Sequence, residues 1–351
     1  MSDQRLSDQR LSDQRPSDQR PSDQNSLLEV IDLSIAVDIG GREELAVDRI
    51  SFTLVPGEAR GLVGESGSGK SLTLRAIMGL LPGNVRVVGG QILFHGKDLL
   101  AAGGRLQQQV RGRGITMIFQ EPAVALNPVM RVGEQIYDGL MQHRGLSRRE
   151  AREQAIRLMD LVGIQDPERR INAYPHELSG GLRQRVMIAA GVSCEPDLIL
   201  CDEPTTALDV TVQDQILRLF AHLRDELGAG LLYVTHDLAV VAQLCDSVTV
   251  LYSGQVMEEG ADLRSVFAHP FHPYTNALIG ATPQIDGPIT RLRAIPGTAP
   301  SLQDRPSGCP FHDRCDRATD ECSETDVPLD ELARGRRSAC LHPLLPTEVS
   351  R

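Results

Sequence analysis

One octapeptide constrains the fold of this chain more than any other feature. Its sequence is Gly64-Glu65-Ser66-Gly67-Ser68-Gly69-Lys70-Ser71. The apolar run Arg60–Val63 before it predicts a short buried strand, and the run Lys70–Leu81 after it predicts a helix that ends before Pro82 and Gly83. A strand, a glycine-rich turn and a helix in this order predict an α/β domain with the turn at the end of a strand.

The octapeptide matches the P-loop pattern in full. Glycines permit the backbone angles that point N–H groups inward, and the start of a helix adds positive potential, so the turn is expected to cradle a polyphosphate. Lys70 is expected to reach the β- and γ-phosphates of ATP, and the Ser71 hydroxyl to coordinate Mg²⁺. The alternative is a glycine-rich turn followed by Lys-Ser by chance. The flanking strand and helix argue against it.

Two carboxylates directly follow the apolar run Leu198–Cys201, which predicts a buried strand. We expect Asp202 to act on Mg²⁺ through its water shell and Glu203 to polarise the attacking water as general base. Two acids at the end of a strand are more often a solvated turn. Together with the P-loop they indicate a site of nucleotide hydrolysis.

The rest of the chain predicts an α/β fold. Alternating apolar residues over Leu27–Val37 and again over Ile50–Leu54 predict an antiparallel β-sheet at the start of the domain. Helical periodicity between Pro122 and Leu178, with a capping box at Ser147 and Glu150, predicts an inserted helical subdomain at about 122–180.

Strand and helix patterns then alternate, as in a parallel sheet covered by helices. They cover Leu198–Cys201, Val210–Leu227, Leu231–Thr235, Leu238–Cys245 and Val248–Leu251. We therefore expect a disordered tail of Ser-Asp-Gln-Arg-Leu/Pro repeats at 1–25 and a nucleotide-binding domain at 26–266. A small, loop-rich domain that contains Pro and Cys is expected at 267–351.

Charge and hydropathy restrict where such a protein acts. The net charge of −11 argues against nucleic-acid binding, which needs an excess of Lys and Arg on one face. No apolar run approaches the roughly 18 to 20 residues that span a bilayer, and no apolar signal segment stands at the N-terminus. These features predict a chain that stays in the cytosol and keeps its cysteines reduced.

The heptapeptide Leu178-Ser179-Gly180-Gly181-Leu182-Arg183-Gln184, just ahead of Asp202 and Glu203, resembles the signature sequence of ABC ATPases. The resemblance implies a RecA-like parallel sheet and a role for Ser179, Gly180 and Gly181 in gripping the γ-phosphate of ATP held by a partner subunit. A predicted helix start there fits anion binding. Without the resemblance, the segment reads as a loop with a helix cap. Leu182 replaces the commonest Gln.

Other elements of the ABC pattern follow in order. Gln120 resembles the Q-loop glutamine that senses Mg²⁺, Ala207-Leu208-Asp209 resembles the D-loop, and His236 resembles the switch histidine that contacts the γ-phosphate. The alternatives are a solvated Gln, a helix cap at Asp209 and a structural His. The segment Glu44–Val47 lacks the aromatic residue that the family uses to stack on adenine.

The C-terminal part resembles the extension of oligopeptide and dipeptide importer ATPases. The resemblance rests on His272-Pro273-Tyr274-Thr275, Ile295-Pro296-Gly297 and Gly308-Cys309-Pro310-Phe311-His312. Some relatives bind a [4Fe–4S] cluster at positions that match Cys309, Cys315, Cys322 and Cys340. The alternatives are zinc, although tight Cys-x₂-Cys pairs are absent, and no metal at all. Cys194, Cys201 and Cys245 are expected to be core thiols.

The family resemblance implies ATP-driven closure of two ATPase subunits, which switches the access of the membrane subunits. The expected partners are a related but distinct ATPase, two membrane permeases and an extracytoplasmic substrate-binding protein, with this chain on the cytoplasmic face of the inner membrane. The expected cargo is a di- or oligopeptide. Importers of nickel, glutathione or antimicrobial peptides, and soluble ABC proteins of translation or DNA repair, are the alternatives.

Overall fold

The computed structural model describes residues 26–206, 208–282 and 293–344. The predicted repeat tail at 1–25 and the last residues, 345–351, lie outside them. A small antiparallel sheet begins the described chain, with order β2-β1-β4-β5. Its strands are β1 (Leu28–Ile39), β2 (Arg42–Leu54), β4 (Val85–Phe94) and β5 (Lys97–Asp98). Gly40 and Gly41 join β1 to β2 with φ of 64° and 83°, the positive angles that a two-residue hairpin turn requires.

The larger sheet carries the predicted motifs. Within the described residues its order is β11-β12-β10-β9-β3-β8-β7-β6. Neighbours in the run from β9 to β6 pair in parallel, and every residue of these five strands is buried, which explains their continuous apolar sequences. These strands are β9 (Ser247–Tyr252), β3 (Ala59–Val63), β8 (Gly230–Thr235), β7 (Leu198–Asp202) and β6 (Ile115–Ile118).

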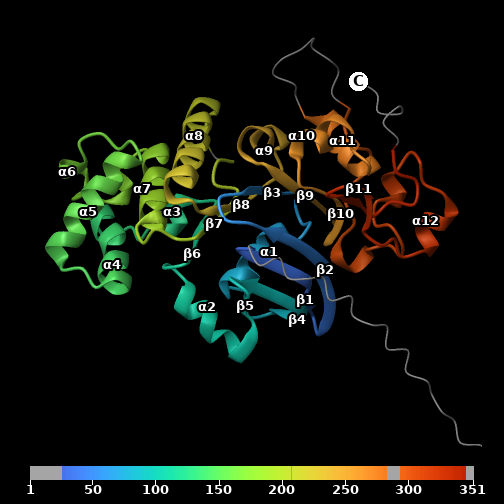
Figure 1. Cartoon of the computed structure of the whole chain (residues 1–351), viewed down its shortest axis with the longest axis horizontal. Coiled ribbons are helices and arrows are strands. Elements are labelled where there is room, and N and C mark those ends of the chain that lie inside the picture. Colours follow the sequence, from blue (N-terminus) through green and yellow to red (C-terminus); the bar gives the residue numbers. More distant parts are fainter. Residues whose placement is uncertain (1–25, 207, 283–292, 345–351) are drawn as a thin grey trace, which may run out of the picture.

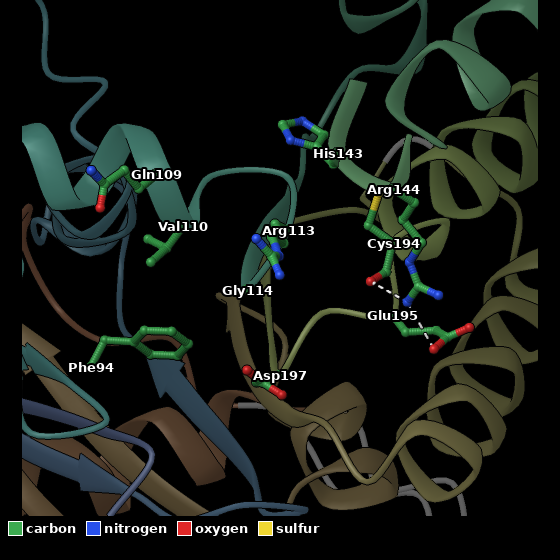
Figure 2. A pocket seen from close by; sticks show the side chains of 10 residues that line it. All are labelled: Phe94, Gln109, Val110, Arg113, Gly114, His143, Arg144, Cys194, Glu195 and Asp197. Carbon is green, nitrogen blue, oxygen red and sulfur yellow. Dashed lines mark hydrogen bonds and ion pairs between the residues drawn. The ribbon is translucent and has the colours of Figure 1, made fainter. Parts of the chain in front are cut away.

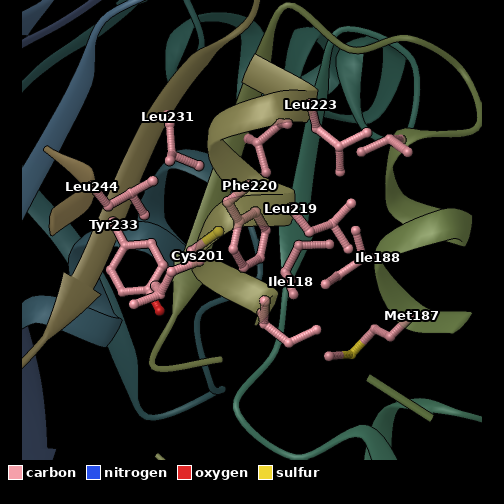
Figure 3. Packing of buried hydrophobic residues seen from close by; sticks show 14 of the residues in the cluster. Ile118, Met187, Ile188, Cys201, Leu219, Phe220, Leu223, Leu231, Tyr233 and Leu244 are labelled. Atoms are coloured by element: carbon pink, nitrogen blue, oxygen red, sulfur yellow. The ribbon is translucent and has the colours of Figure 1, made fainter. Parts of the chain in front are cut away.

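Helices cover both faces of the parallel sheet. Leu62 of β3 packs with α1 (Lys70–Met78) and the antiparallel sheet, whereas its neighbour Val63 belongs to a second core formed with the other helices. In that second core, Phe220 of α8 (Val210–Leu227) lies beside Cys201 and edge-on to Tyr233, at 6.0 Å between ring centroids (Figure 3). Because successive side chains of a strand point to opposite faces of the sheet, this one sheet contributes residues to two cores.

The segment in which we expect a helical subdomain, about 122–180, is largely helical and, together with the helix that follows it, lies at one end of the molecule (Figure 1). Its helices are α3 (Pro122–Ala125), α4 (Val132–Arg144), α5 (Arg148–Leu161), α6 (Pro167–Arg170) and α7 (Gly180–Val192). The capping box is confirmed: Ser147 Oγ accepts from the backbone N–H of Glu150, whose carboxylate accepts from the N–H of Ser147. This pair satisfies donors at the start of α5.

One helix prediction was wrong at its end. α1 stops at Met78, not Leu81, because Gly79 adopts a left-handed φ of 65°. The N–H of Gly79 donates to the carbonyl of Ala76 and the N–H of Leu80 to that of Arg75, which closes the helix before Pro82. The segment between β5 and β6 holds the 3₁₀ turn Ala101–Gly104 and α2 (Arg105–Val110).

The C-terminal part joins the larger sheet. β12 (Arg336–Ser338) pairs with β10 (Gln255–Gly260), and β11 (Asp330–Ala333) pairs with β12. Glu258 is fully buried and receives Arg336 Nη2 at 2.8 Å. The remaining elements are α9 (Leu238–Leu244) and α10 (Leu263–Ala268) before the C-terminal part, and α11 (Pro273–Ala281), the 3₁₀ turns Leu302–Asp304 and His312–Arg314, and α12 (Asp320–Glu324) within it.

No helix of the described ranges combines the length and the apolar character needed to cross a bilayer.

Candidate functional site

The carboxyl ends of four parallel strands bring most of the predicted residues to one edge of the sheet. The loop Gly64–Ser71 follows β3, Asp202 ends β7, and His236 follows β8. In register, Val63 lies opposite Thr235, and Asp202 lies opposite Val234. Because parallel strands end at the same edge, residues separated by more than a hundred positions become neighbours.

The phosphate loop depends on Gly64. A Cβ at this position would lie 2.0 Å from the carbonyl oxygen of Leu251, so no larger residue fits. Gly69, with φ of 95°, is the N-cap of α1. Ser66 and Gly67 are exposed at the tip of the loop, whereas Ser68 is buried. The loop therefore keeps its backbone close to β9 and its tip open to a ligand.

Lys70 points back into this loop. Its Nζ donates to the carbonyl oxygens of Gly64 and Glu65, each at 2.8 Å, and the residue is 4% exposed. Burial lowers the pKa of Lys70, while the carboxylates of Glu203, Asp202 and Glu65 oppose this effect. An ammonium group thus lies within the curve of the loop, where it can offset the charge of a phosphate.

The side chains of Ser71 and Asp202 place two oxygen atoms next to each other. Ser71 Oγ donates to Asp202 Oδ1 at 2.6 Å. Burial raises the pKa of Asp202, and the hydrogen bond from Ser71 opposes the rise. A hydroxyl and a carboxylate are hard oxygen donors of the kind that Mg²⁺ prefers, and their donor chemistry therefore fits this ion.

Glu203 lies beside His236. Its Oε2 is 3.1 Å from His236 Nδ1 and accepts a hydrogen bond from Thr206 Oγ1 at 3.1 Å. The Glu203 backbone has a positive φ of 47°, and its N–H donates to the carbonyl of Val234. Such backbone angles in a residue other than glycine are rare and cluster at functional sites.

Gln120 is exposed two residues beyond β6, which pairs with β7 through Ile118 and Cys201. It therefore lies at the same edge of the sheet as Asp202. Of the predicted D-loop, Ala207 lies outside the described residues. Asp209 caps α8, since its Oδ1 accepts from the N–H of Val212 at 3.0 Å.

The signature segment begins α7, as expected. Ser179 is the N-cap and accepts from the N–H of Leu182, and Ser179 and Gly180 are exposed. Across the described residues, no hydrogen bond joins Ser179, Gly180 or Gly181 to the phosphate loop.

Sequence reasoning missed two residues of the C-terminal part that contact the phosphate loop. Arg314 pairs with the carboxylate of Glu65, 249 positions away, and the hydroxyl of Tyr274 accepts from the Glu65 N–H at 3.0 Å. Tyr274 belongs to a quoted motif, but its spacing carried no sign of this contact. Arg305 also reaches β2, where its Nη2 donates to the carbonyl of Leu45 at 2.5 Å, in the segment without an aromatic residue.

The four C-terminal cysteines line one cavity of about 20 Å³, together with His272, His312 and His342. Burial raises the pKa of Cys309 to about 11 and that of Cys340 to about 12. The donor set suits iron or zinc, but the space fits little more than one water. In the described ranges, no group of three or more His, Cys, Asp or Glu is arranged to hold a metal. The predicted cluster thus gains only the shared cavity as support.

The three other cysteines, Cys194, Cys201 and Cys245, are buried, as expected.

A separate cavity of about 640 Å³ lies between the helical subdomain and the sheets (Figure 2). Its lining includes Gly114, which precedes β6, and Asp197, which precedes β7. Arg144 lines one side of the cavity. It donates a hydrogen bond to the Cys194 carbonyl at 2.9 Å and forms an ion pair with Glu195 at 2.8 Å. The cavity is therefore at the amino ends of the strands, opposite the phosphate loop, and is not the nucleotide site.

Comparison with known proteins agrees with this arrangement. A family profile described as "ABC transporter" matches residues 47–206, and one described as "Oligopeptide/dipeptide transporter, C-terminal region" matches residues 257–322. The oligopeptide transport ATP-binding protein OppD of Salmonella typhimurium is 46% identical over 320 residues, which are 91% of this chain and 95% of OppD. The dipeptide transport ATP-binding protein DppD of Escherichia coli is 44% identical over 319 residues, 91% of this chain and 97% of DppD.

A solved structure is also similar. The dimeric post-hydrolysis state of the ATP-binding cassette MJ0796, bound to ADP and Pi, aligns with a TM-score of 0.60 at 27% identity. The alignment covers 66% of this chain and 97% of that one.

Proposed function

Because this chain belongs to the ATP-binding proteins of the oligopeptide/dipeptide ABC transporters, we propose that its phosphate loop, Asp202 and Glu203 form the hydrolytic half of a composite ATP site. The chain has the ABC ATPase cassette fold and couples ATP hydrolysis to transport. One observation carries the assignment of residues. The Ser71–Asp202 and Glu203–His236 pairs lie at the sheet edge that carries the phosphate loop.

The residues around the phosphates have two roles: some bind the phosphate oxygens, and others compensate their negative charge. The backbone amides of Gly64–Gly69 bind the β- and γ-phosphates, and the ammonium of Lys70 neutralises part of their charge. Ser71, Asp202 and Gln120 hold Mg²⁺, which when bound neutralises charge that develops on the phosphate oxygens.

Glu203 and His236 act on the attacking water. Both contacts described for the Glu203 carboxylate use Oε2, so we assign Oε1 to the water proton. We assign His236 to contact with the γ-phosphate. A carboxylate in this position lowers the barrier by accepting a proton as the water attacks.

A second subunit completes the site. The exposed N-terminus of α7, with Ser179, Gly180 and Gly181, faces the ATP held by a related but distinct ATPase, and Asp209 crosses the interface. The dimeric cassette bound to ADP and Pi supports this arrangement by similarity. Two permeases and an extracytoplasmic binding protein complete an importer of di- or oligopeptides, with this chain on the cytoplasmic face of the inner membrane.

The composition of that assembly can be tested directly. Affinity purification of the tagged chain from native membranes should recover one second ATPase and two permeases. An active complex with two copies of this chain and no second ATPase would contradict the proposed pairing.

We also propose that Cys309, Cys315, Cys322 and Cys340 bind a [4Fe–4S] cluster, with zinc as the alternative. Four soft thiolate ligands suit both an iron–sulfur cluster and zinc. Binding of either requires the cavity to widen. Anaerobically purified protein should contain iron and acid-labile sulfide, both lost in a Cys309→Ser, Cys315→Ser variant. Zinc in place of iron, or no metal, would refute the cluster and leave the ATPase assignment intact.

The two lysines of the chain provide a matched test of the phosphate site. Lys70→Ala should abolish ATP binding, because it removes the ammonium within the loop. Lys97→Ala, an exposed position in β5, should bind ATP normally. Equilibrium binding of labelled ATP separates the two, and normal affinity in Lys70→Ala would contradict the assignment of the loop.

A further inference from the structure

We propose that Arg314, with Tyr274, positions the phosphate loop and cancels the charge of Glu65, so that residues of the C-terminal part tune the affinity for ATP. The proposal rests on the function proposed for the loop and extends it to residues outside the ATPase motifs. Arg314 touches neither the expected phosphates nor the water. It acts through Glu65, the second residue of the loop, and is therefore a positioning residue.

The contact between Arg314 and Glu65 is bidentate. Arg314 Nη1 lies 2.6 Å from Glu65 Oε2, and Nη2 lies 3.0 Å from Oε1. The hydroxyl of Tyr274 accepts from the N–H of the same glutamate at 3.0 Å. The backbone and the side chain of one loop residue are thus both held from the C-terminal part. Paired charge-assisted bonds of this form restrict orientation as well as distance.

Arg314 is itself held in place. Its Nε donates to the carbonyl of Pro296 at 2.7 Å, and its Nη1 also donates to the hydroxyl of Tyr252 at 3.0 Å. The guanidinium lies 5.6 Å from the ring centroid of Tyr252 and 5.8 Å from that of Phe311. Because only 7% of its side chain is exposed, little conformational entropy remains to be lost when it binds Glu65.

The aromatic residues around Arg314 form a packed group that extends to the loop. The ring centroids of Tyr252 and Tyr274 lie 4.7 Å apart, and Phe311 lies 5.3 Å from Tyr252 and 5.1 Å from Tyr274. Tyr252 ends β9, next to the strand that precedes the loop. The group therefore transmits the position of the C-terminal part to the loop through direct contacts.

Electrostatics explains why the loop needs Arg314. A carboxylate in a loop that binds polyphosphate repels its ligand, because like charges close together disfavour each other. The Glu65 carboxylate raises the pKa of Lys70 against the effect of burial, so its negative charge acts on the ammonium group within the loop. The guanidinium neutralises this carboxylate without occupying the phosphate position. Removal of Arg314 leaves one uncompensated negative charge beside the ATP.

A double-mutant cycle tests this charge compensation. In the full transporter complex, Arg314→Met should raise the KM for ATP roughly tenfold, the size expected for a partly exposed charge-assisted pair, and change kcat less than about threefold. In the Glu65→Gln background, Arg314→Met should leave KM near that of Glu65→Gln alone, because no charge remains to cancel.

The controls separate this role from a structural one. Arg334→Met removes an exposed charge of the same C-terminal part and should leave KM unchanged. Tyr274→Phe removes only a hydroxyl, which leaves the Glu65 N–H without its acceptor, and should raise KM modestly while the protein stays folded. This variant tests the proposal even where Arg314→Met fails to fold.

Two results would overturn the proposal: an unchanged KM in both Arg314→Met and Tyr274→Phe, or a defect of Arg314→Met that persists in the Glu65→Gln background. A wild-type complex without ATP turnover would instead refute the proposed function of the loop. The two failures are thus distinguishable.

Discussion

Replacement of Glu203 by Gln removes the proposed general base and little else. The amide has the shape of the carboxylate, and its oxygen can still accept the hydrogen bond from Thr206 Oγ1. The amide cannot take a proton from water. General-base catalysis contributes about 100- to 10,000-fold to a rate, so turnover should fall by this factor, equivalent to roughly 3 to 5 kcal/mol in the activation barrier.

The affinity for ATP should stay within about threefold of wild type, because Lys70 and the loop amides are untouched. Phosphate release from labelled ATP and equilibrium ATP binding measure the two quantities separately. Glu226→Gln, an exposed position of α8, serves as the matched control and should hydrolyse ATP normally. Turnover of Glu203→Gln near that of wild type would remove Glu203 from the mechanism, and a loss of ATP binding would show that it binds nucleotide instead.

Three further substitutions test the loop, the core and a cap. Gly64→Ala should abolish ATP binding, because its Cβ would lie 2.0 Å from the Leu251 carbonyl oxygen; normal binding in a dialysis assay would contradict this. Phe220→Ala, at a position 1% exposed, should lower the free energy of unfolding in urea by about 3–5 kcal/mol, and a loss below about 1 kcal/mol would refute the packing argument. Ser147→Ala should cost about 1 kcal/mol in the same assay, because the N–H of Glu150 loses its acceptor; no measurable loss would show that the cap is replaced by water.

Local signals made much of the fold predictable. The prediction of α8 at Val210–Leu227 is confirmed, because Asp209 caps its start and Gly228 takes a left-handed angle at its end. The end of α1 was predicted wrongly, because Gly79 takes a left-handed angle, as Gly228 does, and ends the helix before Pro82. β11 and β12 were not predicted. They are short, β11 is exposed along its length, and only the pairing of β12 with β10 and of β11 with β12 makes strands of them.

The candidate site was also predictable only where local sequence signals placed its residues. Asp202 and His236 could be placed from sequence because each directly follows or ends a buried apolar strand, and parallel strands share an edge. Their catalytic roles stay predictions. The pairing of Arg314 with Glu65 could not be predicted, since 249 positions separate the residues and nothing in either motif specifies the partner. Contacts of this kind depend on how the C-terminal part packs against the core.

Peptide uptake tests the central claim most directly. Proteoliposomes that contain the transporter complex with this chain should accumulate a labelled di- or oligopeptide only when ATP is supplied on the side of the ATPase subunits. The same complex with Lys70→Ala should accumulate none, while Lys97→Ala should transport normally. Uptake that persists in Lys70→Ala, or a wild-type complex that hydrolyses ATP without moving any peptide, would contradict the account.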